Sequence, residues 1–386
     1  MATASSPTDA ARELAPLAAE LAAQGERDRQ LPAELSRQIA DAGLYRLCVP
    51  ASLGGGEARP AELLGAVEAL AIGDAAAAWC VAVCATAGML AAYVDEDAAH
   101  EVFSDPASVT GGVFAPSGRA IASGDMLTVD GRWRFMSNVA NCDWLMGGCT
   151  VIDDGVVRTG PNGRPDVHLV LFPSDEAEVI DTWSVSGLRA TGSHDTAVDG
   201  VEVRAGRSAS LITDAPHERG SLYAFPAFGL LAAAIAAVCL GIARGALDDL
   251  TELAGAKTPT LSTRKLAERP ATQERTARAE GQVRAARALL HESVAAAERA
   301  AVKGGRIPVE LRAGLRLAAT HAVEASAIAV DEAYRLGGGT AIYETSPLQR
   351  RFRDVHTATQ HMLVGPATWE LSGRSLLGLE LDGAQL

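Results

Sequence analysis

The sequence predicts an α+β protein that is mostly helical, with an N-terminal helical domain, a middle β-barrel or β-sandwich domain and a C-terminal four-helix bundle. Apolar residues recur at helical spacing at both ends of the chain, whereas residues from about 110 to 204 alternate as strands do. The composition agrees, because 48% of the 386 residues are hydrophobic but only 4% are aromatic, and an alanine-rich chain favours helix packing. We place the domains at residues 1–109, 110–212 and 213–386.

Prolines mark the starts of the N-terminal helices. Ser6-Pro7 places a capping hydroxyl before a proline, and Pro32 and Pro60 start two more helices in the same way. The helix expected at residues 75–93 is apolar on nearly all sides. We therefore expect that helix to be buried.

The middle domain is predicted from short alternating segments. The stretch MLTVDGRWRFM alternates apolar and polar residues around Asp130-Gly131, a dipeptide typical of a two-residue hairpin turn. Residues 167–173 and 198–203 are predicted as further strands.

Long helices are predicted after residue 210. Pro308 begins the third of them and the run Gly337 to Gly339 ends it. Four helices of this length pack most simply as an antiparallel bundle. Their expected ranges are 226–255, 267–303, 308–336 and 348–377.

A segment of the first of these helices, residues 225–243, carries no charge and is long enough to cross a bilayer. It is rich in alanine, and Arg244, Asp248 and Asp249 follow it directly. We expect a helix buried inside a protein bundle and no membrane span.

Charge and cysteine usage limit the classes of function. The net charge of −14 argues against nucleic acid or an anionic membrane as a partner, because both would repel the chain, and favours a small-molecule substrate. The six cysteines show no C-x-x-C pair and no spacing suited to zinc, so we expect free thiols and no metal site. The N-terminus lacks the pattern of a secretory signal, and we expect a cytoplasmic protein.

The segment from Arg350 to Gly378 carries two histidines, His356 and His361. Histidine is the only side chain whose unperturbed pKa lies near neutral pH, so acid–base chemistry is most easily housed here. A hydrogen-bonded packing role is the alternative for both.

Four stretches of the chain are similar to a known family. In order, they are GGVFAPSGRA (111–120), GRWRFMSNVANCDW (131–144), TWSVSGLRATGSHD (182–195) and RDVHTATQH (353–361). They resemble the acyl-CoA dehydrogenase superfamily and, within it, the flavin-dependent two-component monooxygenases, which hydroxylate phenols, thiophenes or amino sugars. The resemblance covers nearly the whole chain and implies an acyl-CoA dehydrogenase-like fold.

The resemblance also implies where a flavin ring would lie. The family places two segments against the isoalloxazine, and such a ring needs apolar residues at its face and amides or a hydroxyl at its polar edge. An ordinary sheet core is the alternative, and for Trp133, on the other side of its strand, packing is expected. The matching residues are Phe114, Ala115, Pro116 and Ser117 in one segment and Phe135, Met136 and Ser137 in the other.

For the phosphate or adenosine end of the cofactor, the resemblance implies Arg264 and the glycine turn Gly337, Gly338 and Gly339. A solvated helix end is the alternative for Arg264, and a helix stop is the alternative for the glycines. FMN and FAD both stay open.

One departure distinguishes the branches of the family. A dehydrogenase abstracts a proton with a glutamate, and this chain has His361 and Met362 in the matching region. The resemblance therefore implies that reduced flavin and O₂ form a C4a-(hydro)peroxide, which transfers oxygen to an aromatic carbon, sulfur or amine nitrogen of a substrate. His361 is the candidate base or hydrogen-bond donor. Ser137 and, more weakly, Asn138 are candidate donors to the peroxide.

Substrate and electrons must also reach the site. Trp79, Cys84 and Met89 are candidates for the substrate pocket, with a core role as the alternative. Because no G-x-G-x-x-G follows a strand, we expect a separate NAD(P)H:flavin reductase to deliver reduced flavin. The family usually forms homotetramers. The rival predictions are a divergent FAD-dependent acyl-CoA dehydrogenase and a catalytically inactive assembly protein.

Overall fold

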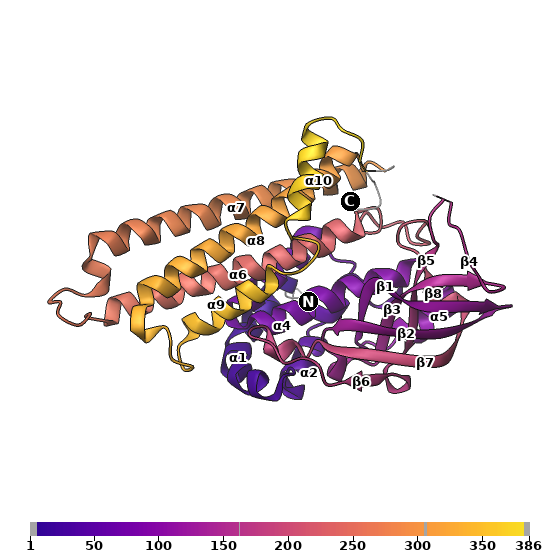
Figure 1. Cartoon of the computed structure of the whole chain (residues 1–386), viewed down its shortest axis with the longest axis horizontal. Helices are drawn as coiled ribbons and strands as arrows, with labels where there is room; N and C mark the ends of the chain where they lie inside the picture. The colour runs from indigo at the N-terminus through magenta and orange to yellow at the C-terminus, as the bar shows by residue number, and fades with distance from the viewer. Residues whose placement is uncertain (1–5, 162, 305–306, 382–386) are drawn as a thin grey trace, which may run out of the picture.

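The computed structural model describes residues 6–161, 163–304 and 307–381 and has three parts along the chain (Figure 1). A sheet lies at one end of the molecule, the free ends of long C-terminal helices lie at the other, and the N-terminal helices lie between them. This mostly helical arrangement around a central sheet confirms the predicted fold class.

The N-terminal helices begin where the prolines predict. Ser6 Oγ accepts a hydrogen bond from Asp9 N at 3.2 Å at the start of the first helix, and Pro60 is the first residue of the third. Pro32 precedes the second as its N-cap residue. The helices are α1 (Pro7–Asp28), α2 (Ala33–Asp41), α3 (Pro60–Gly73), α4 (Ala75–Ala87) and α5 (Glu96–Phe103).

The predicted apolar helix is α4, which continues as a 3₁₀ helix at Gly88–Ala92. The Asp74 carboxylate caps it by accepting a hydrogen bond from Ala77 N at 2.9 Å. Every side chain of α4 except that of Val83 is buried, because the helix packs between α3 and the sheet. α4 therefore joins the helical part of the molecule to the strands.

The strands form one hydrogen-bonded sheet in the order β6-β7-β2-β1-β3-β5-β8, with β4 paired to β3. Among the described residues the end strands β6 and β8 do not pair with each other, so the expected barrel or sandwich is an open sheet. The strands are β1 (Thr110–Ser123), β2 (Met126–Met136), β3 (Trp144–Asp153), β4 (Val156–Val157), β5 (Val167–Pro173), β6 (Glu178–Ile180), β7 (His194–Arg204) and β8 (Ser208–Ala209).

The turn between β1 and β2 corrects the sequence prediction. Ser123 pairs with Met126, so Gly124 and Asp125 form the two-residue turn, and Gly124 has the positive φ of +63° that such a turn favours. Asp130-Gly131 lies inside β2 instead.

Trp133 explains why glycines occur inside these strands. Its indole is fully buried, and its Nε1 donates to Gly148 O at 2.8 Å. A Cβ added to Gly118 would lie 2.4 Å from Trp133 Cζ2, one on Gly147 would lie 2.5 Å from the same atom, and one on Gly131 would lie 2.7 Å from Cη2. The three glycines leave the volume that the ring fills, and Trp133 has the packing role expected for it.

The C-terminal part contains long helices that pack against one another. α6 is the innermost, since it contacts α3, α4, α8 and α9, and Gly338, with a φ of +57°, follows the end of α8 as predicted. The helices are α6 (Ala227–Ala256), α7 (Pro270–Val302), α8 (Val309–Gly337), α9 (Pro347–Ala358) and α10 (Ala367–Leu376).

Within the described part of the chain, two helical stretches are long and apolar enough, by length and composition alone, to cross a membrane. They are Ala75–Ala92 and Ala227–Ala256, and in each an 18-residue window is 94% buried inside the protein. Both therefore serve here as core helices of the fold.

The fourth predicted bundle helix, 348–377, is wrong as a single helix. α9 ends at Ala358 and α10 begins at Ala367, and turns join them. Pro366 is the N-cap residue of α10, so the second helix begins at a proline, as the N-terminal helices do. His361 consequently lies in a connection between two helices.

Candidate active site

Three segments distant in sequence meet around the indole of Trp79 on α4. Trp79 Nε1 donates to Ser137 Oγ at 3.1 Å, just past the end of β2. The same ring meets the imidazole of His361 in an edge-to-face arrangement, with centroids 5.7 Å apart and planes at 68°. The structure therefore brings together one predicted residue from each part of the chain.

A wide bulge in β1 holds the first predicted flavin segment. Val113 is in register with Gly147 and Gly118 with Cys149, so β1 advances five residues where β3 advances two. The bulge residues Phe114 to Ser117 have no register partner on β2 or β3. Gly148 permits this path, because a Cβ there would lie 2.5 Å from Phe114 O.

The second predicted flavin segment ends β2 with unusual backbone geometry. Phe135 has a φ of +67°, its side chain is 66% exposed, and its ring meets Trp183 edge-on at 6.2 Å. A bulky residue in the left-handed region is strained, which is common at functional sites. The side chain of Met136 is fully buried in the sheet, so only its backbone could contribute to the predicted flavin contact.

A chain of hydroxyl groups extends from Ser137 towards β7. Ser137 Oγ lies 2.7 Å from Ser193 Oγ, which lies 2.6 Å from Thr191 Oγ1, and Thr191 Oγ1 donates to Leu188 O at 2.9 Å. Thr191 and Ser193 lie in the stretch 182–195 that resembles the family, but no role is predicted for them from the sequence. Hydroxyls are common in turns, so only their spatial alignment shows that they form a chain.

α9 holds the end of this chain in place. Leu188 has a φ of +51°, and its N–H donates to Asp354 Oδ1 at 2.6 Å. Gly187 lies directly against α9, since a Cβ on it would lie 2.1 Å from Arg353 O. Burial raises the pKa of Asp354 to about 7, and the nearby carboxylates of Asp74 and Glu26 act in the same direction.

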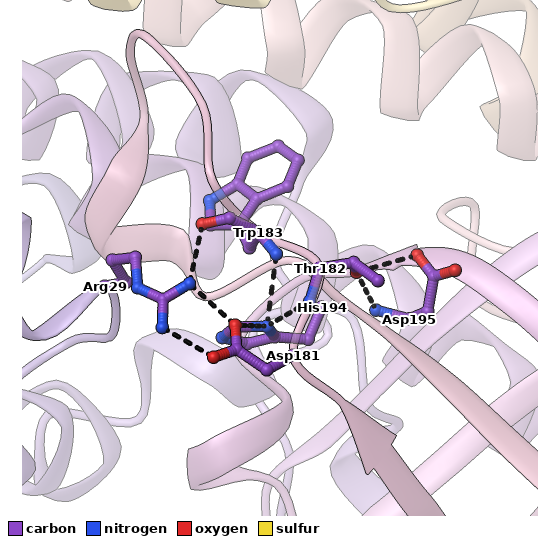
Figure 2. A network of polar contacts seen from close by, with 6 residues as sticks. All are labelled: Arg29, Asp181, Thr182, Trp183, His194 and Asp195. Carbon is purple, nitrogen blue, oxygen red and sulfur yellow. Dashed lines mark hydrogen bonds and ion pairs between the residues drawn. The ribbon is translucent and has the colours of Figure 1, made fainter.

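The loop that precedes this turn is tied to the end of α1 (Figure 2). Arg29 donates to both carboxylate oxygens of Asp181, at 2.6 and 2.8 Å, and to Trp183 O at 3.4 Å. The N–H groups of Thr182 and Trp183 both lie 3.3 Å from His194 Nδ1, which accepts from them. Burial lowers the pKa of His194, in keeping with this acceptor role. The network positions Trp183 beside Phe135.

His361 is half-buried and has a defined tautomer. Its Nδ1 accepts a hydrogen bond from Leu363 N at 3.2 Å, so the proton of the neutral ring lies on Nε2. Burial and then the positive charge of Arg316 lower its pKa to about 4. His361 is therefore a neutral imidazole at physiological pH, with Nε2–H as its donor.

The other histidine of this segment has a different environment. His356 Nε2 lies 2.8 Å from Asp331 Oδ1 on α8, and its ring packs on Phe352 with centroids 4.5 Å apart. His356 thus has the packing role expected for it.

Two family models match the chain, the acyl-CoA dehydrogenase N-terminal domain over residues 8–108 and the acyl-CoA dehydrogenase C-terminal domain over residues 233–366. The indole-3-acetate monooxygenase of Pseudomonas putida is 32% identical over 360 residues, which are 92% of this chain and 90% of that protein. The chain belongs to the flavin-dependent monooxygenase branch of the acyl-CoA dehydrogenase family.

Further relatives of this flavin-dependent monooxygenase agree. The oxygenase subunit HsaA from Mycobacterium tuberculosis is 29% identical over 89% of this chain and 88% of that protein. The crystal structure of the 3-HSA hydroxylase from Rhodococcus sp. RHA1 matches with a TM-score of 0.90 over 99% of both chains at 26% identity. XiaF from Streptomyces sp., solved with FADH2 and glycerol, has a TM-score of 0.88 at 25% identity over 97% of this chain and 95% of that one.

The residues of the monooxygenase site fit a flavin. The bulge residues lack ladder partners, so their backbone groups suit the polar edge of the ring, and the exposed Phe135 and half-buried Phe114 suit its apolar face. The enzyme uses flavin and O₂, and the alternative of an acyl-CoA dehydrogenase is less well supported by its relatives.

Asn138 is a buried residue beside Ser137, and its role as a donor to the reacting oxygen stays a prediction. Its φ of +63° lies in the left-handed region that favours glycine. Its Nδ2 donates to Cys84 Sγ at 3.5 Å, and its Oδ1 accepts from Asn141 at 3.0 Å. The buried amide thus has a partner at its nitrogen and at its oxygen. Cys84 and Met89 are buried as well, and the indole of Trp79 contacts His361.

Arg264 and the glycine run lie away from this cluster. Arg264 is exposed in the loop between α6 and α7, and Gly337 O accepts from Lys257 Nζ at 2.7 Å at the end of α8. Both positions are at the far end of the long helices from α4 and the sheet (Figure 1). Within one chain, the structure therefore does not bring them to the Trp79 cluster.

Proposed function

We propose that this chain is the oxygenase component of a two-component system that receives reduced flavin from a separate NAD(P)H:flavin reductase and oxygenates a small aromatic substrate. Two relatives support the division of labour, because one is named an oxygenase subunit and another, the resorcinol hydroxylase of Rhizobium sp., is named an oxygenase component dependent on FADH(2). Bound reduced flavin supplies the electrons that activate O₂.

The observation that carries the proposal is the neutral His361 beside Trp79, whose indole N–H bonds to Ser137. An imidazole with a pKa of about 4 is too weak a base to accept a proton at neutral pH, but its Nε2–H is a permanent donor. We assign His361 the role of donating a hydrogen bond that orients the substrate. Of the two roles predicted for His361, base and hydrogen-bond donor, we propose the donor.

The aromatic substrate class rests on the lining of the site. Trp79 and Phe135 are the aromatic side chains of the site. Burial there disfavours charged groups, since it lowers the pKa of His361, and this favours an uncharged aromatic substrate. Relatives are named for indole-3-acetate and resorcinol. The proposed reaction is oxygenation at a ring carbon. Oxygenation at sulfur or at an amine nitrogen is the alternative, and the comparison of substrates below distinguishes the three.

A homotetramer in the cytoplasm is the proposed assembly and location. All six cysteines lie among the described residues, buried and free, as suits a reducing compartment. Ile328 on α8 is 48% exposed, and Leu376 and Leu377 at the end of α10 are 78% and 77% exposed. These helices therefore offer apolar surface for subunit contacts.

The test supplies chemically reduced FMN or FAD and air to the purified enzyme with a phenol, an aryl sulfide or an amino sugar. Oxygenated phenol is the expected product, and product formed per O₂ consumed is the measurement. In His361→Phe, which keeps an aromatic ring but has no N–H, we expect product to fall at least about tenfold and hydrogen peroxide release to rise. Reduction of bound oxidised flavin by an acyl-CoA thioester would instead establish the dehydrogenase.

A further inference from the structure

The hydroxyl chain behind Ser137 has a donor at one end and an acceptor at the other. The indole N–H of Trp79 can only donate, and it bonds to Ser137 Oγ. The carbonyl of Leu188 can only accept, and Thr191 Oγ1 bonds to it. Ser193 lies between Ser137 and Thr191, within 2.7 Å of the first and 2.6 Å of the second.

Counting hydrogens along the chain gives its direction once Thr191 Oγ1 donates to Leu188 O, a carbonyl that also accepts from Thr191 N at 3.1 Å and from Trp183 Nε1 at 3.2 Å. Each hydroxyl has one hydrogen, and Thr191 uses its hydrogen on Leu188 O. Ser193 must then donate to Thr191, and Ser137 must donate to Ser193. Ser137 accepts from Trp79 and keeps one free lone pair. It then has no hydrogen left for a ligand, which differs from its predicted role as a donor to the reacting oxygen.

We infer that Thr191 and Ser193 are positioning residues that make Ser137 a hydrogen-bond acceptor towards the flavin and so favour reduced over oxidised flavin. The inference rests on the proposed function, and it takes the Ser137 hydroxyl, in the predicted flavin segment, to face N5 of the bound ring. Reduced flavin carries a hydrogen on N5 and matches an acceptor, whereas N5 of oxidised flavin is itself an acceptor. Reversing the chain to suit oxidised flavin forfeits the bond from Thr191 to Leu188 O. One such bond corresponds to about fivefold in affinity.

Thr191→Val tests the inference, because it keeps the shape of the side chain and removes the acceptor of Ser193. Ser193 would then donate to Ser137, and Ser137 would donate to the flavin. The dissociation constants of oxidised flavin and of anaerobically reduced flavin are measured by titration, with FMN and FAD in parallel. We expect the ratio of the oxidised to the reduced constant to fall about fivefold in the variant.

Three further variants separate the chain from general packing. Thr191→Ser keeps the hydroxyl and should keep the ratio of the wild type. Thr196→Val makes the same substitution at a buried hydroxyl on β7 that has no hydrogen-bond partner among the described residues, and it should leave the ratio unchanged. Ser193→Ala frees the hydrogen of Ser137 by another route, so it should lower the ratio and carries the test if Thr191→Val does not fold.

The outcomes are distinguishable. A wild-type ratio in both Thr191→Val and Ser193→Ala, with tight binding of reduced flavin, overturns the directed chain and leaves the proposed function intact. Equal falls in Thr191→Val and Thr196→Val would assign the effect to packing and also overturn it. A wild-type protein that binds neither form of FMN or FAD overturns the proposed function and the inference together.

Discussion

The position of single hydrogen atoms distinguishes the side chains around Trp79. His361 carries its proton on Nε2 because Leu363 N–H occupies Nδ1. Ser137 directs its proton towards Ser193, because Ser193 bonds to Thr191 and Thr191 donates to the Leu188 carbonyl. One residue therefore donates and the other accepts, although both can do either in solution.

The titration of His361 is a direct prediction. Its folded pKa of about 4 lies below the usual 6.5, so the unfolded chain binds a proton more readily between these values. The contribution of His361 to stability is present above pH 6.5 and is lost as the pH falls towards about 4. NMR of ¹⁵N-histidine-labelled protein should show one imidazole that stays neutral down to about pH 5 and is absent from His361→Gln. A titration of that signal near 6.5 would contradict the assignment.

The glycines around Trp133 allow a prediction on stability. In Gly147→Ala the new Cβ would meet the indole at 2.5 Å, and the surrounding strands leave the ring no space to move. We expect a loss of about 1–3 kcal/mol in the free energy of unfolding measured with denaturant. Gly281→Ala is the matched control, because a Cβ there meets nothing within 4 Å inside α7. It should stabilise the protein by roughly 0.5–1 kcal/mol, and a similar loss in both variants would refute the steric explanation.

Residue types predicted part of the site and missed part of it. Ser137 and His361 were predicted because a hydroxyl and an imidazole suit flavin chemistry, and Trp79 was predicted as a substrate-pocket residue of a buried helix. Thr191 and Ser193 were missed because the role of a hydroxyl depends on which neighbour takes its hydrogen, and that requires coordinates. Asn138 uses one hydrogen of its amide on Cys84 Sγ and accepts from Asn141, and neither contact follows from its place in the sequence.

Among the elements, α9 has a function beyond packing in the bundle. Its residue Asp354 accepts from Leu188 N at 2.6 Å and so fixes the turn that ends the hydroxyl chain. Position along the chain gives no sign of this contact, because 166 residues separate the two partners.

The raised pKa of Asp354 predicts a pH dependence of opposite sign to that of His361. Between 3.8 and about 7 the folded protein holds a proton that the unfolded chain releases. The contribution of the group to stability is therefore present below pH 3.8 and is lost as the pH rises through about 7. Asp354→Asn mimics the protonated form, so relative to wild type it should gain roughly 3 kcal/mol between pH 4 and pH 8.

Denaturant unfolding at several pH values measures this difference. A difference between variant and wild type that is constant across the range would show that Asp354 does not titrate there. Asp181→Asn serves as a comparison, since Arg29 lowers the pKa of that exposed carboxyl and its contribution should be lost only in acid.

Elements were predicted best where capping residues mark their ends. Pro7, Pro60 and the glycine run bounded helices correctly, because caps act locally. The helix after residue 348 was predicted too long, because its apolar spacing continues through residues 359–366, where the backbone forms turns. Asp130-Gly131 was misassigned because the glycine leaves space for the indole of Trp133 two residues along the same strand, and pattern alone does not distinguish this need from that of a turn.

The whole molecule combines a charged surface with exposed apolar positions on its long helices, which predicts self-association. Light scattering should give a mass of about 160 kDa, four times the 39.9 kDa of one chain. Ile328→Asp should lower this mass because it places a charge on the exposed apolar surface of α8. Val157→Asp on β4, where the side chain is 46% exposed, is the control and should leave it unchanged. A wild-type mass near 40 kDa would exclude the tetramer.

The order of the three parts was predictable because the strand-like alternation of the middle part differs from the helical spacing on either side of it. That order together with four motifs led to the family. How the parts meet was not predictable. The contact between α4, the end of β2 and the connection after α9 joins residues 79, 137 and 361, and no local pattern encodes such a junction.

The break between α9 and α10 has a consequence for how such enzymes diversify. Both helices pack on α8 separately, so the eight residues between them are held at each end, and Val364 among them is buried in the core. Substitutions at the other positions of this connection can change the groups beside His361 while the helices stay in place. Grafting the connection from a related hydroxylase, with Val364 retained, is then a route to altered regioselectivity.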